Sequence, residues 1–268
     1  KPFKVLAASE PCDIVSGPRI GISKAAERPW RFGLPGAQGL SRSFPAQRVA
    51  RAVALLRTDF ARTLPVERLA EASVPVLGAT LTAIGNWRRR PDDADAHVLA
   101  DIALRDPLMC LRVLLNASRR FGHPLVAPSQ TVTAALVLTG VDPFFRDCVE
   151  LPVLEERLAG QPLALAGALA AIDRAHAAAR LAAAIAIHRQ DEQVERLHQA
   201  ALLSDFPRLL LWCEAPELVL EMQKRQRHDP ALRSADVQRE VLGVELDALA
   251  AALVDRWQLP DSLRELTE

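Results

Sequence analysis

From residue 46 onward, apolar residues recur every three or four positions, and alternation at every second position is absent. The segment 46–64 is an example, with apolar residues that form one helical stripe: Val49, Val53, Leu56 and Phe60. Strands favour aromatic and β-branched residues, but this chain contains no tyrosine and only 4% aromatic residues. The fold class predicted for this part of the chain is therefore mostly α, with essentially no sheet.

Capping residues and glycines give approximate limits for the later helices. Asp95 can cap a helix that runs towards Leu104, and Asp106 followed by Pro107 can begin the next one. Ser129 is expected to cap a segment that ends at Gly140, where the glycine would adopt a left-handed conformation. The remaining predicted helices run from about Pro162 to Ile187, from Pro216 to about Arg227, from Ser234 to Gly243, and from Glu245 to Trp257.

The first 45 residues have a different composition. Short pieces that mix isoleucine, glycine and aromatic residues between prolines predict strands up to residue 34, and the Pro-, Gly- and Ser-rich stretch 34–45 is typical of a linker. We therefore divide the chain into a strand-containing segment 1–42, a linker with a leading helix at 43–73, and a helical domain at 74–268.

The net charge is zero, but its distribution is uneven. Residues 1–57 carry a charge of +7 and the remainder −7. A basic end on an acidic body is compatible with contact between that end and an anionic partner, and drift in composition explains it equally well.

The cysteines and the most apolar stretch bear on the compartment. Four isolated cysteines without a CxxC pair argue against a disulfide framework or a zinc ribbon, and a reduced cytoplasmic compartment fits best. The stretch 163–187 carries Asp173, Arg174, His176 and Arg180, which makes it too polar to span a membrane. We therefore expect a cytoplasmic protein without a membrane partner.

Three stretches of the helical part carry a further pattern. The first, 104–116, combines Asp-Pro, a run of leucines and an asparagine; the second is 200–205; the third joins 239–243 to 256–260. In this order and at these distances they resemble the HDOD family, a non-catalytic branch of the HD phosphohydrolases, over roughly residues 74–266. The resemblance implies a two-lobed, multi-helix domain. The family's recurring positions are Asp106, Pro107, Asn116, Asp205, Gly243, Trp257 and Pro260, and we interpret them as caps, turns and core anchors.

The same resemblance allows the hydrolytic chemistry to be judged. An HD hydrolase needs histidine and aspartate side chains that converge on a divalent metal, which activates a bound water. Here Ser204 stands in place of the doublet histidine beside Asp205, and Leu246 stands where a later histidine is expected. His176, expected at the start of its helix, occupies a position where the family often has a histidine, but it lacks companions. We therefore expect no metal, no cofactor and no catalytic residue.

Two functional alternatives follow from the resemblance. The favoured one is signal transduction through contacts with protein partners of a signalling pathway. The other is an active phosphohydrolase with unconventional metal ligands, which bound metal and phosphodiesterase turnover would reveal.

A second resemblance lies in residues 17–42. The pieces 18–25 and 29–32 are similar to the closing motif of bacterial DNA-3-methyladenine glycosylases of the alkyladenine type, and they include Arg19, Ile20 and Gly21. In that family the motif forms a wall of the pocket for a flipped base, while the catalytic glutamate and an intercalating tyrosine lie upstream.

Because this chain has no tyrosine, we expect residues 1–42 to be a catalytically inactive remnant, with DNA as a partner only if a complete glycosylase domain precedes Lys1. A natural fusion of a glycosylase to the HDOD-like part is our preferred explanation. The alternative is an amino-terminal arm that lies on the helical domain.

Overall fold

The computed structural model describes residues 65–121 and 129–265, which are mostly helical. The helices are α2 (Pro65–Glu71), α3 (Gly78–Arg88), the short 3₁₀ helix η1 (Pro91–Asp93), α4 (Ala96–Ala103), α5 (Pro107–Phe121), α6 (Val132–Thr139), α7 (Val141–Asp147), α8 (Leu154–Arg157), α9 (Pro162–His188), α10 (Val194–Leu203), α11 (Phe206–Glu214), α12 (Pro216–His228), α13 (Ser234–Leu242), α14 (Leu246–Trp257) and α15 (Asp261–Arg264). The predicted helical class is confirmed for these residues. The strands expected near the amino terminus and the helix expected at 46–64 lie outside them.

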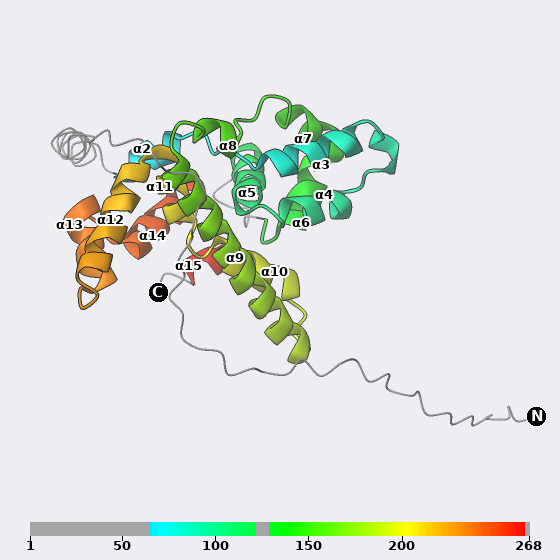
Figure 1. The fold of residues 1–268 in the computed structure, drawn as a ribbon. Coiled ribbons are helices and arrows are strands. Elements are labelled where there is room, and N and C mark those ends of the chain that lie inside the picture. Colours follow the sequence, from blue (N-terminus) through cyan, green and yellow to red (C-terminus); the bar gives the residue numbers. More distant parts are fainter. Residues whose placement is uncertain (1–64, 122–128, 266–268) are drawn as a thin grey trace, which may run out of the picture. The chain divides into compact units, whose positions relative to one another are not determined.

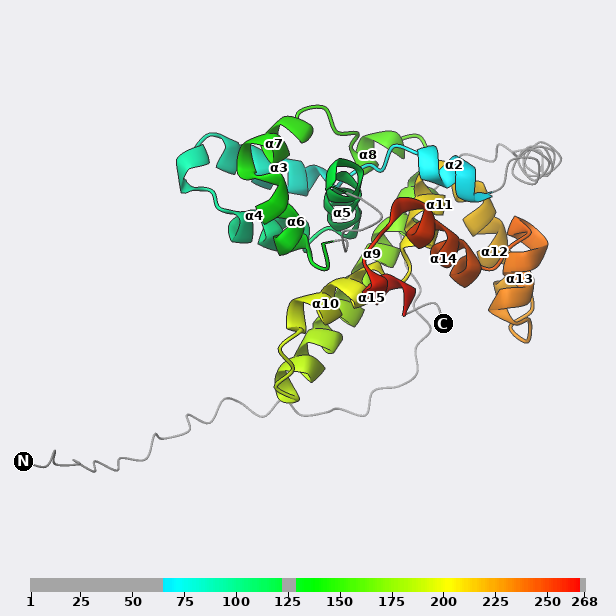
Figure 2. The same ribbon diagram turned by 180° about the vertical axis from the view of Figure 1, so that it is seen from behind.

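Helix α5 connects two groups of helices (Figure 1). It packs against α4 and α6, which together with α3 and α7 form one group, and against α10, α11 and α14 of the other. The reverse view shows the same division, with α12, α13 and α14 gathered away from α3, α4 and α7 (Figure 2). This arrangement agrees with the two lobes that the family resemblance implies.

The only β-type pairing among the described residues is a parallel bridge between Val76 and Val153. The amide of Val76 donates to the carbonyl of Pro152 at 2.9 Å, and the amide of Leu154 donates to the carbonyl of Val76 at 2.9 Å. The bridge therefore joins the residues just before α3 to those just before α8.

Most of the predicted helix limits are confirmed. Asp95 caps α4, since its Oδ1 accepts a hydrogen bond from the amide of Val98 at 2.8 Å. Helix α5 begins at Pro107, directly after Asp106. Gly243 directly follows the last residue of α13, as predicted, and adopts a left-handed conformation with φ +79°.

Three local predictions were wrong. Thr131, not Ser129, caps α6, because the Thr131 hydroxyl accepts from the amide of Ala134. Gly140 has a positive φ of 84° but an extended ψ of 155°, since it ends α6 and immediately precedes α7. His176 lies in the middle of α9 rather than at the start of a helix, because that helix already begins at Pro162.

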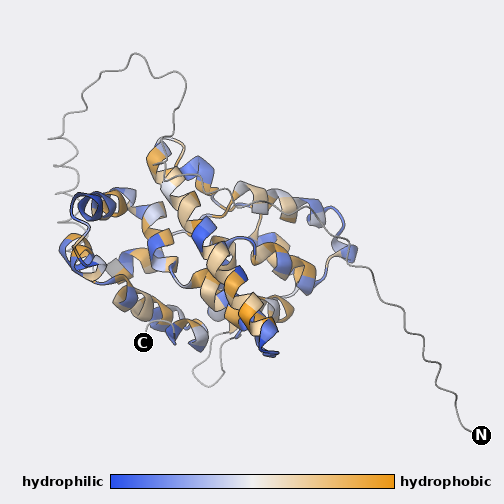
Figure 3. Ribbon diagram, turned by 60° about the horizontal axis from the view of Figure 1, so that its bottom comes forward, coloured by the Kyte–Doolittle hydropathy of each residue, from blue (hydrophilic) through white to orange (hydrophobic). Residues whose placement is uncertain are grey.

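The described residues share one apolar core, built mainly from leucine, alanine and valine. Most helices carry both hydrophobic and hydrophilic residues, as amphipathic helices do (Figure 3). Trp212 of α11 is fully buried and packs on Gly167 of α9. A Cβ atom at Gly167 would lie 2.3 Å from Cη2 of Trp212, so the glycine permits the close approach of α9 and α11.

We expect Gly167→Ala to destabilise the protein. Alanine favours a helix by up to about 1 kcal/mol over glycine. However, the clash with a buried, rigid indole should outweigh that gain and give a net loss of about 1–3 kcal/mol. Gly85→Ala in α3 is the matched control, because nothing lies within 4 Å of its Cβ position. Urea denaturation should show a lower midpoint for Gly167→Ala alone, and equal midpoints for the two variants would contradict this packing role.

Candidate functional site

The carboxylate of Asp106 is fully buried and accepts four hydrogen bonds. Its Oδ1 accepts from the amides of Leu108 and Met109, at 2.9 and 3.2 Å, as an N-cap of α5 does. Its Oδ2 accepts from the amide of Leu77 at 2.8 Å and from the hydroxyl of Thr80 at 2.9 Å, both at the start of α3. Burial raises the pKa of Asp106, and these four hydrogen bonds oppose the rise. One side chain therefore fixes the beginnings of two helices.

Asn116 and Trp257, two other family positions, make contacts between helices. The Asn116 amide nitrogen lies 3.4 Å from Oδ2 of Asp147 at the end of α7. Trp257 is buried at the end of α14, and its indole N–H donates to the carbonyl of Ala70 in α2 at 3.3 Å. Its own carbonyl accepts from the hydroxyl of Ser118 in α5 at 2.6 Å. These contacts are compatible with the predicted role of core anchors.

Pro107, Gly243 and Pro260 lie at helix boundaries. Pro107 is the first residue of α5, Gly243 follows α13, and Pro260 immediately precedes α15. Pro107 and Pro260 are buried, whereas Gly243 is exposed. Their places are compatible with the predicted roles as caps and turns.

The positions that correspond to the HD residues are drawn from α9, from the junction of α10 and α11, and from the start of α14. Ser204 ends α10, and its hydroxyl donates to the carbonyl of Ala201 at 2.9 Å. Asp205 follows, and its Oδ2 accepts from Nε of Arg208 at 2.7 Å. Arg208 therefore pairs with one of the two carboxylate oxygens of Asp205, while the Asp205 side chain stays 44% exposed.

Asp205 also interacts electrostatically with neighbouring elements. Burial raises its pKa, Arg208 and Arg174 of α9 lower it, and Asp247 of α14 raises it further. The structure therefore brings parts of α9, α11 and α14 together around this carboxylate, as the HD resemblance requires, but the charges that reach it include two arginines.

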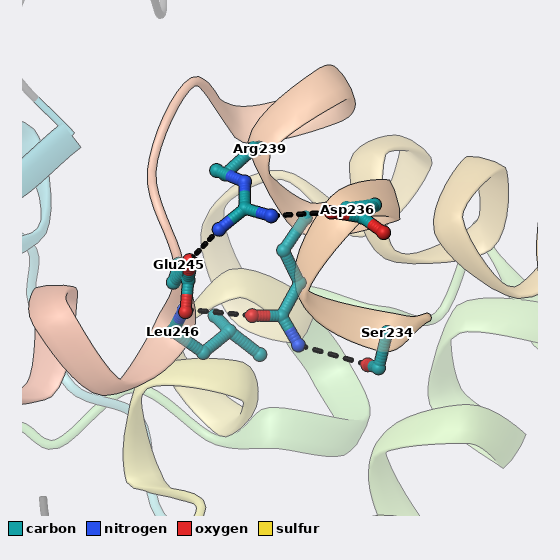
Figure 4. Close-up of polar contacts among 6 residues, drawn as sticks. Ser234, Asp236, Arg239, Glu245 and Leu246 are labelled. Carbon is teal, nitrogen blue, oxygen red and sulfur yellow. Dashed lines mark hydrogen bonds and ion pairs between the residues drawn. The ribbon is translucent and has the colours of Figure 1, made fainter. Parts of the chain in front are cut away.

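Leu246 stands where the family resemblance leads us to expect a metal-binding histidine. It is buried at the start of α14 (Figure 4). Its amide donates to Oε1 of Gln238 at 2.9 Å, and Nε2 of Gln238 donates to the Ser234 hydroxyl at 3.0 Å. Arg239 lies between Asp236 and Glu245 and pairs with both. This region is a helix junction held by polar contacts, with the apolar side chain of Leu246 in the core.

His176 has a neighbour that the sequence did not reveal. Its Nε2 is buried without a hydrogen-bond partner among the described residues. Burial lowers the pKa of His198 in α10, His176 lowers it further, and Glu195 raises it. The effect of His176 places the two histidines near each other. The spacing of His198 from the other histidines gave no sign of this proximity, since the two residues lie on different helices.

The candidate donors do not assemble into a metal site. Within residues 65–121 and 129–265, no group of three or more His, Cys, Asp or Glu side chains is placed to hold a metal ion. Clefts of about 390 and 450 Å³ lie elsewhere: Trp257 and Arg256 line the first, and Arg88 and Arg146 the second. The HD positions thus offer neither a ligand set nor one of these clefts.

Comparison with known proteins gives two kinds of similarity. A family model described as HDOD domain matches residues 74–268. The fold is similar to that of the MmoQ response regulator of Methylococcus capsulatus strain Bath, with a TM-score of 0.56 and 23% identity over 74% of this chain and 76% of that one. It is also similar to a virulence factor of Campylobacter jejuni, with a TM-score of 0.56 and 16% identity over 78% and 74% of the two chains.

The second similarity is short and strong. A protein of Nitrosospira multiformis named "Putative 3-methyladenine DNA glycosylase" is 56% identical over 43 residues, which are 16% of this chain and 22% of that protein. A protein of the same name from Rhizobium johnstonii is 59% identical over 39 residues, or 15% and 20% of the two chains. This chain spans about a fifth of the length of these relatives, and both resemblances recognised in the sequence are confirmed.

Among the described residues, no helix has the length and apolar character needed to cross a membrane.

Asp106→Asn should destabilise the domain strongly. The amide nitrogen that replaces one carboxylate oxygen is a donor, so it would face hydrogen-bond donors at the start of α3 or of α5. We expect a loss of roughly 2–4 kcal/mol, measured by urea denaturation. Asp95→Asn is the control, because asparagine caps a helix as well as aspartate does and the change should stay within about 0.5 kcal/mol. A similarly small change at Asp106 would show that the buried carboxylate is dispensable.

Proposed function

Because this chain belongs to the HDOD domain family, we propose that its helical part is a non-enzymatic regulatory domain that acts through contacts with proteins of a signalling pathway. The observation that supports this proposal most is the state of the HD positions. Asp205 is paired with Arg208, and the two expected histidines are replaced by Ser204 and Leu246. A relative with the same fold is named a response regulator, which favours a signalling role.

The chemistry of the site argues against hydrolysis. A metal-dependent hydrolase lowers the pKa of a metal-bound water, and it needs several converging nitrogen and oxygen ligands to hold that metal. Asp205 has a cation as its partner, and the Ser204 hydroxyl donates to its own helix backbone. Residues in these states supply neither a tight ligand set nor a general base. We further propose that the domain needs no cofactor, while the cytoplasmic location stays a prediction from the isolated cysteines.

The test combines metal analysis, hydrolysis and a regulatory readout. The purified chain, incubated with Mn²⁺, Fe²⁺ or Zn²⁺ and desalted, should retain no stoichiometric metal and should not turn over bis-p-nitrophenyl phosphate. The regulatory readout is the genome-wide transcript profile of the native host, because a signalling domain acts on the output of its pathway. Deletion of residues 74–268 should change this profile, whereas Asp205→Asn should leave it as in the wild type. Bound metal together with turnover that Asp205→Asn abolishes would establish the phosphohydrolase alternative instead.

A second function is favoured by the short glycosylase similarity. We propose that this chain is the carboxyl-terminal part of a DNA-3-methyladenine glycosylase joined to an HDOD domain. The identity of 56% over 43 residues supports this reading of the amino-terminal segment. Since the chain lacks the tyrosine that the family uses to intercalate into DNA, activity would require residues upstream of Lys1.

The mass of the native polypeptide tests this second proposal. An antibody against the helical domain should detect a product substantially larger than 29.3 kDa, the mass of this chain. The larger product should excise 3-methyladenine from alkylated DNA, while residues 1–268 alone should not. A native product of 29.3 kDa would show that the glycosylase-like segment is a vestige.

A further inference from the structure

Helix α9 buries one face and exposes an apolar one. The buried face is made of alanines and one isoleucine, which point towards the core: Ala164, Ala168, Ala171, Ile172, Ala175 and Ala179. On other faces, Leu163, Leu181 and Ile187 are 73%, 62% and 64% exposed. Figure 1 shows α9 running diagonally from beside α11 to the lower part of the view, with α10 packed beside it. Exposed apolar residues mark a contact surface when they are contiguous, so their arrangement around α9 decides what they signify.

The exposed residues follow a heptad pattern. Two rows, each with a spacing of seven residues, run along the outer face, and all eight residues are exposed: Leu163, Ala170, Ala177 and Ala184 in one row, and Ala166, Asp173, Arg180 and Ile187 in the other. At about 100° per residue, the two rows lie opposite the buried face. Apolar residues at these two heptad positions form the seam of a coiled coil. We call this set of eight residues the outer seam.

We propose that the outer seam pairs with the outer seam of a second copy of this chain in antiparallel orientation. Asp173 and Arg180 lie in the same row, and the midpoint between them falls between residues 176 and 177. Each lies about 5 Å along the helix axis from that midpoint, at 1.5 Å per residue. A twofold axis at that midpoint creates two equivalent contacts, each between Asp173 of one copy and Arg180 of the other.

The charges select this orientation over the parallel one. A parallel pair in register would place each Asp173 against Asp173 of the other copy, and each Arg180 against Arg180, which is repulsive. In the antiparallel pair Ile187 of each copy approaches Ala166 of the other, because these two residues of the same row lie equally far from the axis. The alanines between them allow the two helix backbones to approach closely.

Asp173 and Arg180 are available for such a contact. Both are exposed, and among the described residues neither forms an ion pair within the chain. Seven residues along a helix separate them by about 10 Å, so they do not pair with each other in one copy. The proposal concerns self-association and does not depend on the regulatory function or on the state of the HD positions.

Charge reversal in the full chain tests the pairing. By light scattering or sedimentation at low salt, the wild type should have twice the mass of 29.3 kDa. Asp173→Arg and Arg180→Asp should each weaken dimerisation at least about tenfold, because each creates like charges at both contacts. The double variant with both changes should restore the dimer, and an equimolar mixture of the two single variants should form a heterodimer.

Cysteine cross-linking tests the register independently. Ala177→Cys lies near the proposed twofold axis and should give a disulfide-linked dimer on mild oxidation. Ala178→Cys is the matched control, because this residue is also exposed but points about 100° away. Circular dichroism should confirm that all variants fold. A monomeric wild type would overturn the proposal, since it would leave the outer seam to another segment or another protein. A dimer that neither charge reversal weakens would overturn it as well.

Discussion

The arrangement of the helices depends on the four hydrogen bonds that the buried carboxylate of Asp106 accepts. The residue before α3, Leu77, offers no side-chain cap, so the first amides of that helix need acceptors from elsewhere. Asp106 supplies one, and Glu155 supplies another by accepting from the amide of Gly78 at 3.1 Å. Since Asp106 also caps α5, the helix that contacts both groups, the position of α3 is tied to the centre of the domain.

Local signals allowed much of the fold to be predicted. Asp95, Asp106 and Gly243 act within a few residues of themselves, and their identity alone is enough to place a helix end. The choice between Ser129 and Thr131 was harder, because both can cap a helix and stand two residues apart. The contact of Asp106 with Thr80 was beyond reach, since it joins residues 26 positions apart through the tertiary fold.

At the HD positions, too, the residues could be identified from the sequence, whereas contacts between helices could not. The sequence identified Ser204, Asp205 and Leu246 by resemblance, and the losses at two of them were visible directly. The pairing of Asp205 with Arg208 could have been suspected from their spacing of three residues on a helix. The proximity of His176 and His198 could not, because it depends on how α9 packs against α10. The segment that carries Arg19, Ile20 and Gly21 lies outside the described residues, and its role rests on sequence similarity.

The ion pair between Asp205 and Arg208 also has an evolutionary consequence. A return to metal binding would need histidines at positions 204 and 246 together with removal of Arg208. Taken singly, loss of Arg208 strips the half-buried Asp205 of its partner, and a histidine at position 246 inserts a polar ring into the core. Neither change alone assembles a ligand set, because a tightly held metal needs several converging donors. A metal site at these positions therefore requires several substitutions made together.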